Sequence, residues 1–310
     1  MKFLMSVEKY TKPPALTKGD TIGIIAPSSP FFSKNLNSGV QHLRQFGFKV
    51  KIPASVFEYR KYDLHGDKAK AKEIHALFRD PAVKAIFCAK GGYGCIRLLP
   101  HLDANLIRAH PKIFMGYSDT SFILNFLLSR CNLVCFHGPM VLGELSRDMP
   151  QVKQKEMLTA LTGRKALGKL THKNIQVIKK GKASGILMGG CLSSLVRILG
   201  TSYEINTEGA ILFLEDISES PTNIEEMLFH LKIAGKLDKV HGLVFGQMYN
   251  CGSPNVLMHR IAESLADIAV PMLFGFPSGH SFSNITLPLG MRVTLDSKVP
   301  GLIFRQIAVS

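Results

Sequence analysis

A regular alternation of short apolar runs with amphipathic helical patterns restricts the fold of this chain more than any other feature. The apolar runs of the first half are TIGIIAP at 21–27, AVKAIFCA at 82–89, KIFMGY at 112–117 and LVCFHGP at 133–139. Strands that are apolar on both faces and separated by helices are typical of a mostly parallel sheet with helices on both sides. We therefore predict an α/β fold whose strand-to-helix loops meet at the carboxyl edge, where such sheets bind ligands.

The second half has its own set of strand candidates. They are GILMGG at 185–190, AILFLED at 210–216, HGLVFGQM at 241–248, PMLFGF at 271–276, RVTLD at 292–296 and LIFRQIAV at 302–309. Between the halves lies the basic stretch Arg164–Lys182, which we interpret as a solvated linker. The sequence thus predicts an N-terminal domain over 1–163, a basic linker over 164–182 and a C-terminal α/β or α+β domain over 183–310.

Composition and charge restrict the partners. The 310 residues are 46% hydrophobic and 20% charged, which is typical of a soluble globular protein and not of a disordered chain. A formal charge of +15 is compatible with nucleic acid, an acidic membrane or a small acidic substrate. The basic residues are scattered, and the dense stretch 164–182 has no interleaved aromatic residues that could stack on bases. We therefore expect no nucleic-acid partner.

The six cysteines form no CxxC pair and lie mostly in apolar runs, so we interpret them as buried reduced thiols. Cys131, Cys135 and His137 come closest to a set of metal ligands. They fall on a strand-like segment whose side chains alternate between two faces, and this disfavours a shared ion. The sequence predicts no metal site.

The N-terminal segment 1–20 has too short an apolar stretch for a secretory signal, and no apolar stretch in the chain is long enough to cross a bilayer. We therefore expect a cytoplasmic protein without a membrane partner.

Gly116-Tyr117-Ser118-Asp119 stands where an apolar strand gives way to a helical pattern. A serine at such a junction can be an exposed nucleophile, next to helix amides that face a developing negative charge. The segment matches half of the G-x-S-x-G nucleophile elbow, since Thr120 replaces the second glycine. The segment alone leaves open whether Ser118 or Asp119 is instead a helix N-cap.

Three further positions carry polar groups past strand ends. The glycines at 91, 92 and 94 could present backbone amides to an anion, although they match neither a Walker A motif nor a dinucleotide fingerprint. Glu215 ends one strand candidate and could orient a histidine or cap a turn, with Asp216 as its rival. His280 follows another strand candidate among small residues, and composition does not distinguish it from the ten other histidines.

Several segments, in matching order, resemble the LD-carboxypeptidases, a family of serine peptidases that includes the microcin C immunity peptidases. The segments are KGGYG, MGYSDTSFILNFL, FHGPM, GGCLSSLVRILGTSYEI, ILFLEDISESP, AGKLDKVHGLVFGQM and FGFPSGH. The resemblance runs from IGIIAPSS to LPLGMRVTLD, which is nearly the whole chain. It implies a Rossmann-like N-terminal domain that carries the serine, a C-terminal domain that carries a glutamate and a histidine, and an active site between them.

This resemblance also implies roles for individual residues. Ser118 would be the nucleophile, His280 the general base and then acid, and Glu215 the residue that orients the imidazole. The backbone amides of Gly92 and Asp119 would form the oxyanion hole. The implied reaction is hydrolysis of the bond between the L-centre of meso-diaminopimelate and the terminal D-alanine of murein tetrapeptides, in the cytoplasm during cell-wall recycling. The resemblance further implies a homodimer that needs no metal or cofactor.

The chain departs from the family pattern at three places. Lys90 replaces an arginine, Cys191 replaces an asparagine, and SPTNIEEM at 220–227 replaces a Pro-Tyr segment that ends in Asp-Arg. These departures bear on substrate preference and motivate an alternative, hydrolysis of a nucleotide-peptide antibiotic conjugate. A loop over 219–226 could also control access to the site. A further alternative is a non-catalytic α/β protein that binds an anion through its glycine loop.

Overall fold

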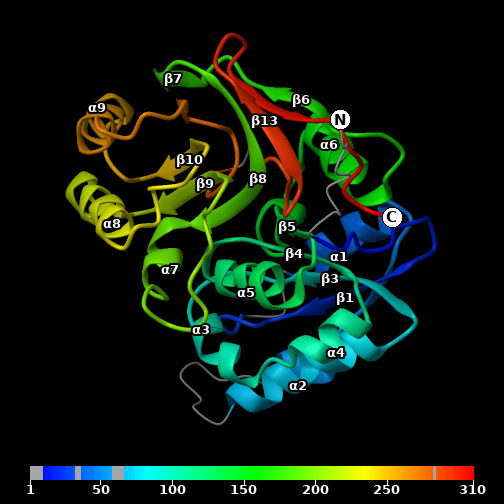
Figure 1. Cartoon of the computed structure of the whole chain (residues 1–310). Coiled ribbons are helices and arrows are strands. Elements are labelled where there is room, and N and C mark those ends of the chain that lie inside the picture. Colours follow the sequence, from blue (N-terminus) through cyan, green and yellow to red (C-terminus); the bar gives the residue numbers. More distant parts are fainter. Residues whose placement is uncertain (1–9, 32–35, 58–65, 282–283) are drawn as a thin grey trace, which may run out of the picture.

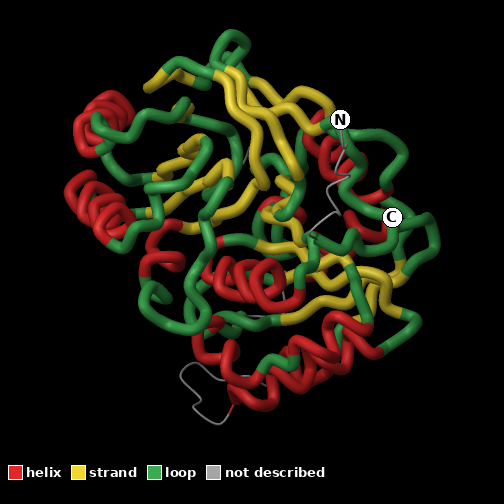
Figure 2. Tube along the Cα trace, in the orientation of Figure 1, coloured by secondary structure: helices red, strands yellow, loops and turns green. Residues whose placement is uncertain are grey.

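The computed structural model describes residues 10–31, 36–57, 66–281 and 284–310. Two sheets with helices around them form the molecule (Figures 1 and 2). The expectation of no secretory signal depends partly on residues 1–9, which lie outside the described residues. Within the described ranges, no helix has the length and apolar character that a bilayer crossing requires.

The first sheet has six strands in the order β12-β5-β4-β3-β1-β2. Their bounds are β1 Thr21–Ile25, β2 Lys49–Lys51, β3 Val83–Cys88, β4 Ile113–Gly116, β5 Cys135–His137 and β12 Leu287–Leu289. The strands β1 to β5 pair in parallel, and β12 joins β5 antiparallel. This confirms the predicted mostly parallel sheet. Its strand order reverses between β1 and β3, which is where doubly wound sheets open a ligand crevice.

Helices cover both faces of the first sheet. Their bounds are α1 Leu36–Gln45, α2 Gly66–Arg79, α3 Cys95–Leu98, α4 Ala104–Ala109 and α5 Ser121–Cys131, with the 3-10 turns η3 Leu99–His101, η4 Ser118–Thr120 and η5 Glu144–Ser146. Helices α2, α4 and α5 pack in succession on one face, and α1 lies on the opposite face (Figure 1). Along the sheet, β2 lies on one side of β1, whereas β3, β4 and β5 follow on the other side. Right-handed crossovers therefore place α1 on one face and the later helices on the opposite face.

The second sheet has eight strands in the order β6-β14-β13-β8-β9-β10-β11-β7. Their bounds are β6 Gly168–Thr171, β7 Gln176–Lys179, β8 Lys182–Cys191, β9 Ala210–Ile217, β10 Gly242–Tyr249, β11 Met272–Phe274, β13 Arg292–Asp296 and β14 Gly301–Phe304. Parallel pairs join β8, β9, β10 and β11, whereas the outer strands pair antiparallel. The remaining helices are the 3-10 turn η2 Ala54–Phe57, α6 Gln151–Thr162, α7 Leu192–Val196, α8 Pro221–Ile233 and α9 Pro254–Ser264.

The basic stretch 164–182 is not a linker, which corrects the sequence interpretation. It contains β6 and β7, the two edge strands of the second sheet. Its lysines suit that position, because charged side chains on edge strands oppose pairing with another chain. The C-terminal half also crosses into the first sheet through β12. Sheet membership therefore does not follow the ranges 164–182 and 183–310, and the domain boundaries stay a prediction.

Candidate active site

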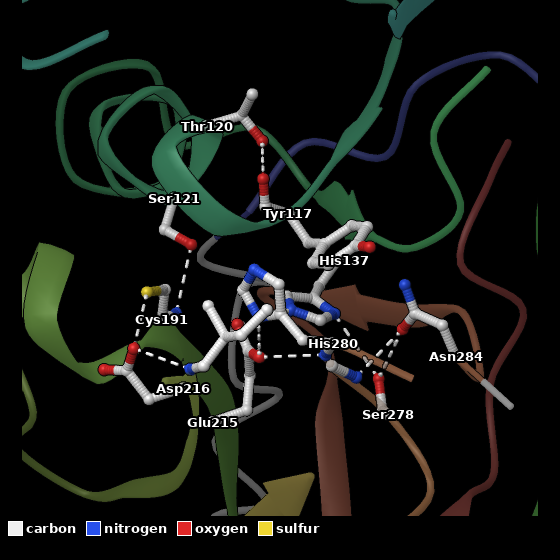
Figure 3. A network of polar contacts seen from close by, with 12 residues as sticks. Tyr117, Thr120, Ser121, His137, Cys191, Glu215, Asp216, Ser278, His280 and Asn284 are labelled. Carbon is white, nitrogen blue, oxygen red and sulfur yellow. Dashed lines mark hydrogen bonds and ion pairs between the residues drawn. The ribbon is translucent and has the colours of Figure 1, made fainter. Parts of the chain in front are cut away.

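Ser118 lies on a sharp turn between β4 and α5. Its φ is 63°, in the left-handed region that residues other than glycine rarely adopt. Such a backbone costs of order 1–3 kcal/mol and persists where the surroundings enforce it. Here the Thr120 hydroxyl donates to the Tyr117 carbonyl at 2.8 Å and closes the turn (Figure 3). Thr120, which breaks the G-x-S-x-G pattern, therefore stabilises the elbow, and Ser118 remains half-buried at its tip.

Asp119 connects this elbow to the glycine loop. Its Oδ2 accepts a hydrogen bond at 3.0 Å from the backbone amide of Cys95, the first residue of α3. In the described part of the chain, neither Ser118 nor Asp119 caps the helix that follows it, because η4 and α5 have no side-chain cap. The N-cap alternative is therefore wrong for both residues. The carboxylate instead holds two neighbouring loops of the sheet edge together.

The glycine loop lies directly against Ser118. A Cβ built on Gly91 would stand 2.9 Å from both Cβ and Oγ of Ser118, so a side chain there would press on the hydroxyl. Gly92 has φ 133°, which side chains rarely tolerate, and its Cα faces the hydroxyl of Ser29. Among the hydrogen bonds of the described residues, none uses the backbone amide of Gly92 or of Asp119 as donor. Neither amide therefore has a hydrogen-bond acceptor among the described residues.

Glu215 and His280 form a tight pair although 65 positions separate them. The Nδ1 atom of His280 lies 2.6 Å from Oε2 of Glu215, and the backbone amide of His280 donates to the same oxygen at 3.1 Å (Figure 3). Gly279, with φ 118°, permits this approach, because a Cβ there would lie 2.6 Å from Oε2. The Glu215 side chain is fully buried at the end of β9, whereas one tenth of the His280 side chain is exposed. The carboxylate therefore fixes the imidazole in place.

The pKa values of this pair move apart. Burial alone would raise the pKa of the Glu215 carboxyl, but the charge of His280, its hydrogen bond and the neighbouring His137 outweigh this effect and leave the pKa well below its usual range. Burial alone would lower the pKa of the His280 imidazole, yet the neighbouring Glu215 charge raises it above the usual value. Glu215 is thus an anion that stabilises a protonated His280.

Asp216, the rival carboxylate, is buried but points elsewhere. Its Oδ2 accepts from the Ser193 amide at 2.7 Å, and its Oδ1 accepts from the Ile217 amide at 2.9 Å; Figure 3 shows the contact between Asp216 and Cys191. Burial raises its pKa, and the adjacent Glu215 charge adds to this. The structure therefore places Glu215, and not Asp216, against the histidine.

The ring of Tyr117 connects the serine side of the site with the histidine side. The Tyr117 ring meets the His280 ring edge-on at 4.9 Å between centroids, and it lies 5.6 Å from the His137 ring. Tyr117 is the residue before Ser118, so the elbow and the imidazole are neighbours. In the described residues, the Ser118 hydroxyl forms no hydrogen bond with His280. Glu215 is thus paired with His280, and the turn that carries Ser118 lies next to His280 without a hydrogen bond between the two side chains.

Several groups around this pair carry no clear signal in the sequence. The sequence suggests His137 only as a metal ligand, but its buried Nε2 lies 3.6 Å from Oε1 of Glu215. Glu144 accepts from the Tyr117 hydroxyl at 2.9 Å and from the Asn284 amide at 3.4 Å, and Asn284 accepts from the Gly279 amide. One feature of the sequence does point to His137: it ends β5, the strand that follows β4. The carboxyl ends of parallel strands lie at the same edge of a sheet, so His137 and Ser118 share that edge.

The site is built from carboxylate, imidazole, hydroxyl and amide groups. No cluster of three or more His, Cys, Asp or Glu side chains suited to a metal ion occurs among the described residues. All six cysteines are free and buried, and burial raises the pKa of the Cys191 thiol near the site. A neutral thiol is a poor nucleophile, and this disfavours a nucleophilic role for Cys191.

The three departures from the family pattern lie at different positions in the structure. Cys191 is buried and its backbone amide donates to the Ser121 hydroxyl at 3.1 Å. Lys90 is half-buried before the glycine loop. The segment 220–227 begins helix α8, with Ser220 accepting from the Asn223 amide at 3.1 Å and Pro221 at the first helical position. Most of the loop expected over 219–226 is therefore helical.

The fold and site define a class: a two-sheet α/β hydrolase with a serine elbow, a glycine loop and a buried Glu-His pair. Residues 22–138 match the LD-carboxypeptidase N-terminal domain, and residues 184–295 match the LD-carboxypeptidase C-terminal domain. The chain belongs to the LD-carboxypeptidase family and is a serine-type carboxypeptidase of that family.

Similar proteins come from both branches of this family. A probable murein peptide carboxypeptidase of Bacillus subtilis is 36% identical over 297 residues, which cover 92% of each chain. The microcin C7 self-immunity protein MccF of Escherichia coli is 30% identical over 319 residues, covering 91% of this chain and 92% of MccF. A solved MccF mutant in complex with adenosine monophosphate has a TM-score of 0.89 at 26% identity, covering 97% and 100%. The solved muramoyltetrapeptide carboxypeptidase of Oxalobacter formigenes has a TM-score of 0.81 at 27% identity, covering 92% and 97%.

Proposed function

We propose that Ser118, His280 and Glu215 form a catalytic triad that cleaves the bond between meso-diaminopimelate (L-centre) and the terminal D-alanine of murein tetrapeptides. The observation that carries the proposal is the 2.6 Å contact between His280 and a fully buried Glu215, beside the elbow of Ser118. A carboxylate that holds Nδ1 leaves Nε2 to take a proton from a hydroxyl. Relatives named murein peptide carboxypeptidase support the substrate class.

The residues divide the reaction between them. Nε2 of His280 accepts the Ser118 proton while Oγ attacks the carbonyl carbon of the scissile bond. The amides of Gly92 and Asp119 donate to the oxygen that becomes negative, and Glu215 stabilises the imidazolium. His280 then returns the proton to the amino group of the leaving D-alanine. Water activated by the same imidazole attacks the acyl-enzyme and releases the shortened peptide.

This mechanism requires a contact that the structure lacks, a hydrogen bond between Ser118 and His280. Catalytic hydrogen bonds are often long in enzymes without substrate and become shorter in the complex. The proposal therefore includes the formation of this bond when the peptide binds. The formal charge of +15 on the protein supports attraction of a substrate that ends in a free carboxylate.

The direct test uses the full-length protein and a sugar-free murein tetrapeptide. Wild type should release D-alanine, and Ser118→Ala should lose turnover by about 10⁴-fold or more. Ser129→Ala is a matched control, because Ser129 lies in the adjoining helix α5 and its hydroxyl bonds to nothing among the described residues. No D-alanine from wild type, or equal release by Ser118→Ala, would refute the proposal.

A second candidate is hydrolysis of a nucleotide-peptide antibiotic conjugate. The likeness to MccF, including a structure of MccF in complex with aspartyl sulfamoyl adenosine, favours it. One observation weighs against it: MccF has a tryptophan whose mutant was solved with adenosine monophosphate, and this chain contains no tryptophan. Competition between aspartyl sulfamoyl adenosine and tetrapeptide in one assay separates the two. A non-catalytic anion binder would leave Ser118 unlabelled by a fluorophosphonate probe and would hydrolyse neither compound.

We further propose that the protein acts in the cytoplasm as a homodimer during cell-wall recycling, without a metal, nucleic acid or membrane partner. The relative named murein tetrapeptide carboxypeptidase supports this setting. Sedimentation of the purified protein should give twice the mass of one 34.2 kDa chain. Turnover should survive dialysis against a chelator, and a monomer or a chelator-sensitive enzyme would contradict this part of the proposal.

A further inference from the structure

His137 is a buried polar side chain to which the triad assigns no role. It ends β5, directly opposite Gly116 of β4 in the register, and its side chain is inaccessible to solvent. Its ring lies between Tyr117 and the edge-on ring of Phe213, at 5.1 Å from the latter. A histidine enclosed in this way must have partners for both ring nitrogens, because an unpaired buried polar atom is costly.

The two nitrogens of His137 face different groups. Nδ1 lies 3.4 Å from the Ser278 hydroxyl, and Nε2 lies 3.6 Å from Oε1 of Glu215. The second distance exceeds a hydrogen bond, and neither of its two atoms has another hydrogen-bond partner among the described residues. Each is therefore the available partner of the other.

Chemistry fixes which of these two atoms holds a proton. Glu215 is ionised, so Oε1 can only accept a hydrogen bond. Nε2 of His137 must then carry a hydrogen, whether the ring is neutral or charged, since two lone pairs would otherwise face each other. The Glu215 carboxylate thus has an imidazole on each oxygen: His280 at Oε2 and His137 at Oε1.

We propose that His137 is a positioning residue that acts through Glu215: its Nε2–H fixes and stabilises the carboxylate on the side opposite His280. This inference rests on the proposed function, because it assigns His137 a part in preparing His280 as base. Without the N–H of His137, the negative charge of Glu215 is stabilised by fewer hydrogen-bond donors. The pair then binds a proton more readily, and His280 becomes available as a base only at higher pH.

Other ionisable groups surround this pair and stay the same when His137 changes. Glu144 and Asp216 face His280 with carboxyl groups, from η5 and β9. Tyr117, Cys191 and Cys251 lie close enough to Glu215 to feel its charge, and burial raises the pKa of each and keeps it neutral. A change in the titration of His280 after substitution of His137 is therefore due to His137.

The test compares His137→Phe, which keeps a ring and removes both nitrogens, with His137→Gln, which keeps an N–H donor. In the tetrapeptide assay, His137→Phe should lose roughly tenfold or more in kcat with little change in KM. The acid limb of its kcat/KM profile should move up by about one pH unit, as expected for the loss of a hydrogen bond to a charge. His137→Gln should restore most of both. Phe213→Leu, which disturbs the packing against His137 but keeps its nitrogens, should leave the limb in place.

A measurement without substrate separates this inference from the proposed function. In nitrogen NMR of the wild-type protein, Nε2 of His137 should appear protonated, and His280 should titrate at higher pH in His137→Phe than in wild type. An unprotonated Nε2, or an unchanged limb and an unchanged His280 titration in His137→Phe, would overturn the inference even if D-alanine is released. Lack of D-alanine release together with the expected NMR result would refute the proposed substrate and leave the role of His137 supported. If His137→Phe does not fold, the wild-type protonation state and the His137→Gln profile decide.

Discussion

The serine side and the histidine side of the site are held together in different ways. On the first sheet, Ser118 is positioned by backbone shape: a left-handed residue, a closed turn and a glycine loop within 30 positions. On the second sheet, His280 is positioned by a buried charge on Glu215, far away in the sequence. Substitutions on the serine side should therefore reduce the rate without moving the pH profile, whereas substitutions on the histidine side should move it.

The sharpest test of this contrast is Glu215→Gln, which keeps the shape and removes the charge. The amide cannot stabilise the imidazolium and can favour the wrong tautomer of His280, so kcat should fall about 10⁴-fold. D-alanine release by the folded variant measures this. Asp216→Asn is a matched control, because Asp216 is the neighbouring buried acid but bonds to backbone amides and not to His280. Equal losses in both variants would mean that burial of charge, and not contact with the histidine, matters.

The corresponding change on the serine side is Gly91→Ala. The added methyl group would lie 2.9 Å from the Ser118 hydroxyl, which must then shift. A misplacement of this size costs about 10²-fold in rate. The acid limb of kcat/KM should stay where it is, because no charge changes. A moved limb would show that the two sides are not independent.

Without any substitution, the pH dependence reports the histidine side. His280 must be neutral to act as base, and the Glu215 charge raises its pKa above the ordinary value of about 6.5. Below the raised pKa, kcat/KM should fall about tenfold per pH unit. The raised pKa also stabilises the fold, fully below about pH 6.5, and this contribution is lost as pH rises through the pKa in the folded state. Denaturant unfolding across this range should therefore show stability decreasing as activity appears; a limb below pH 6.5 would contradict the assignment.

The smallest effect concerns the turn that holds Ser118. Thr120→Val removes the hydrogen bond to the Tyr117 carbonyl and should lower the free energy of unfolding by about 1 kcal/mol, with a modest loss of rate. Thr201→Val removes a similar turn bond, to the Ile198 carbonyl at 2.7 Å, outside the described site contacts. It should cost similar stability and no rate. Equal kinetics in the two variants would mean that the elbow does not depend on Thr120.

Sequence periodicity predicted the mostly parallel first sheet and located the central strands of the second, because those strands are buried on both faces and read as apolar runs. It failed for β6 and β7, which are polar edge strands in the stretch 164–182 and carry no such signal. Strand pairing across large separations, such as β12 with β5, depends on tertiary packing that no local pattern records.

The same distinction applies to the site: its local features could be predicted from the sequence, and its long-range contacts could not. The elbow at Ser118 and the glycine loop could be located from strand ends, and the resemblance to a family added Glu215 and His280. The side of the carboxylate that each histidine occupies could not be predicted, because it depends on the register between β4 and β5. That register puts His137 opposite Gly116. The hydrogen bond from the Cys95 amide to Asp119 is likewise a contact between residues far apart in the sequence. From the sequence alone, Asp119 could equally be a helix cap.

The stretch of chain that carries His280 begins in one sheet and ends in the other. It leaves β11 of the second sheet and returns as β12 of the first, next to β5. On the β11 side of this stretch, Gly279 pairs with Gln247 of β10, and the Gln247 amide donates to the Ser278 carbonyl at 2.9 Å, so this part is fixed to the sheet that carries Glu215. We therefore expect the Glu-His pair to stay with the second sheet and to remain assembled while peptides enter and leave.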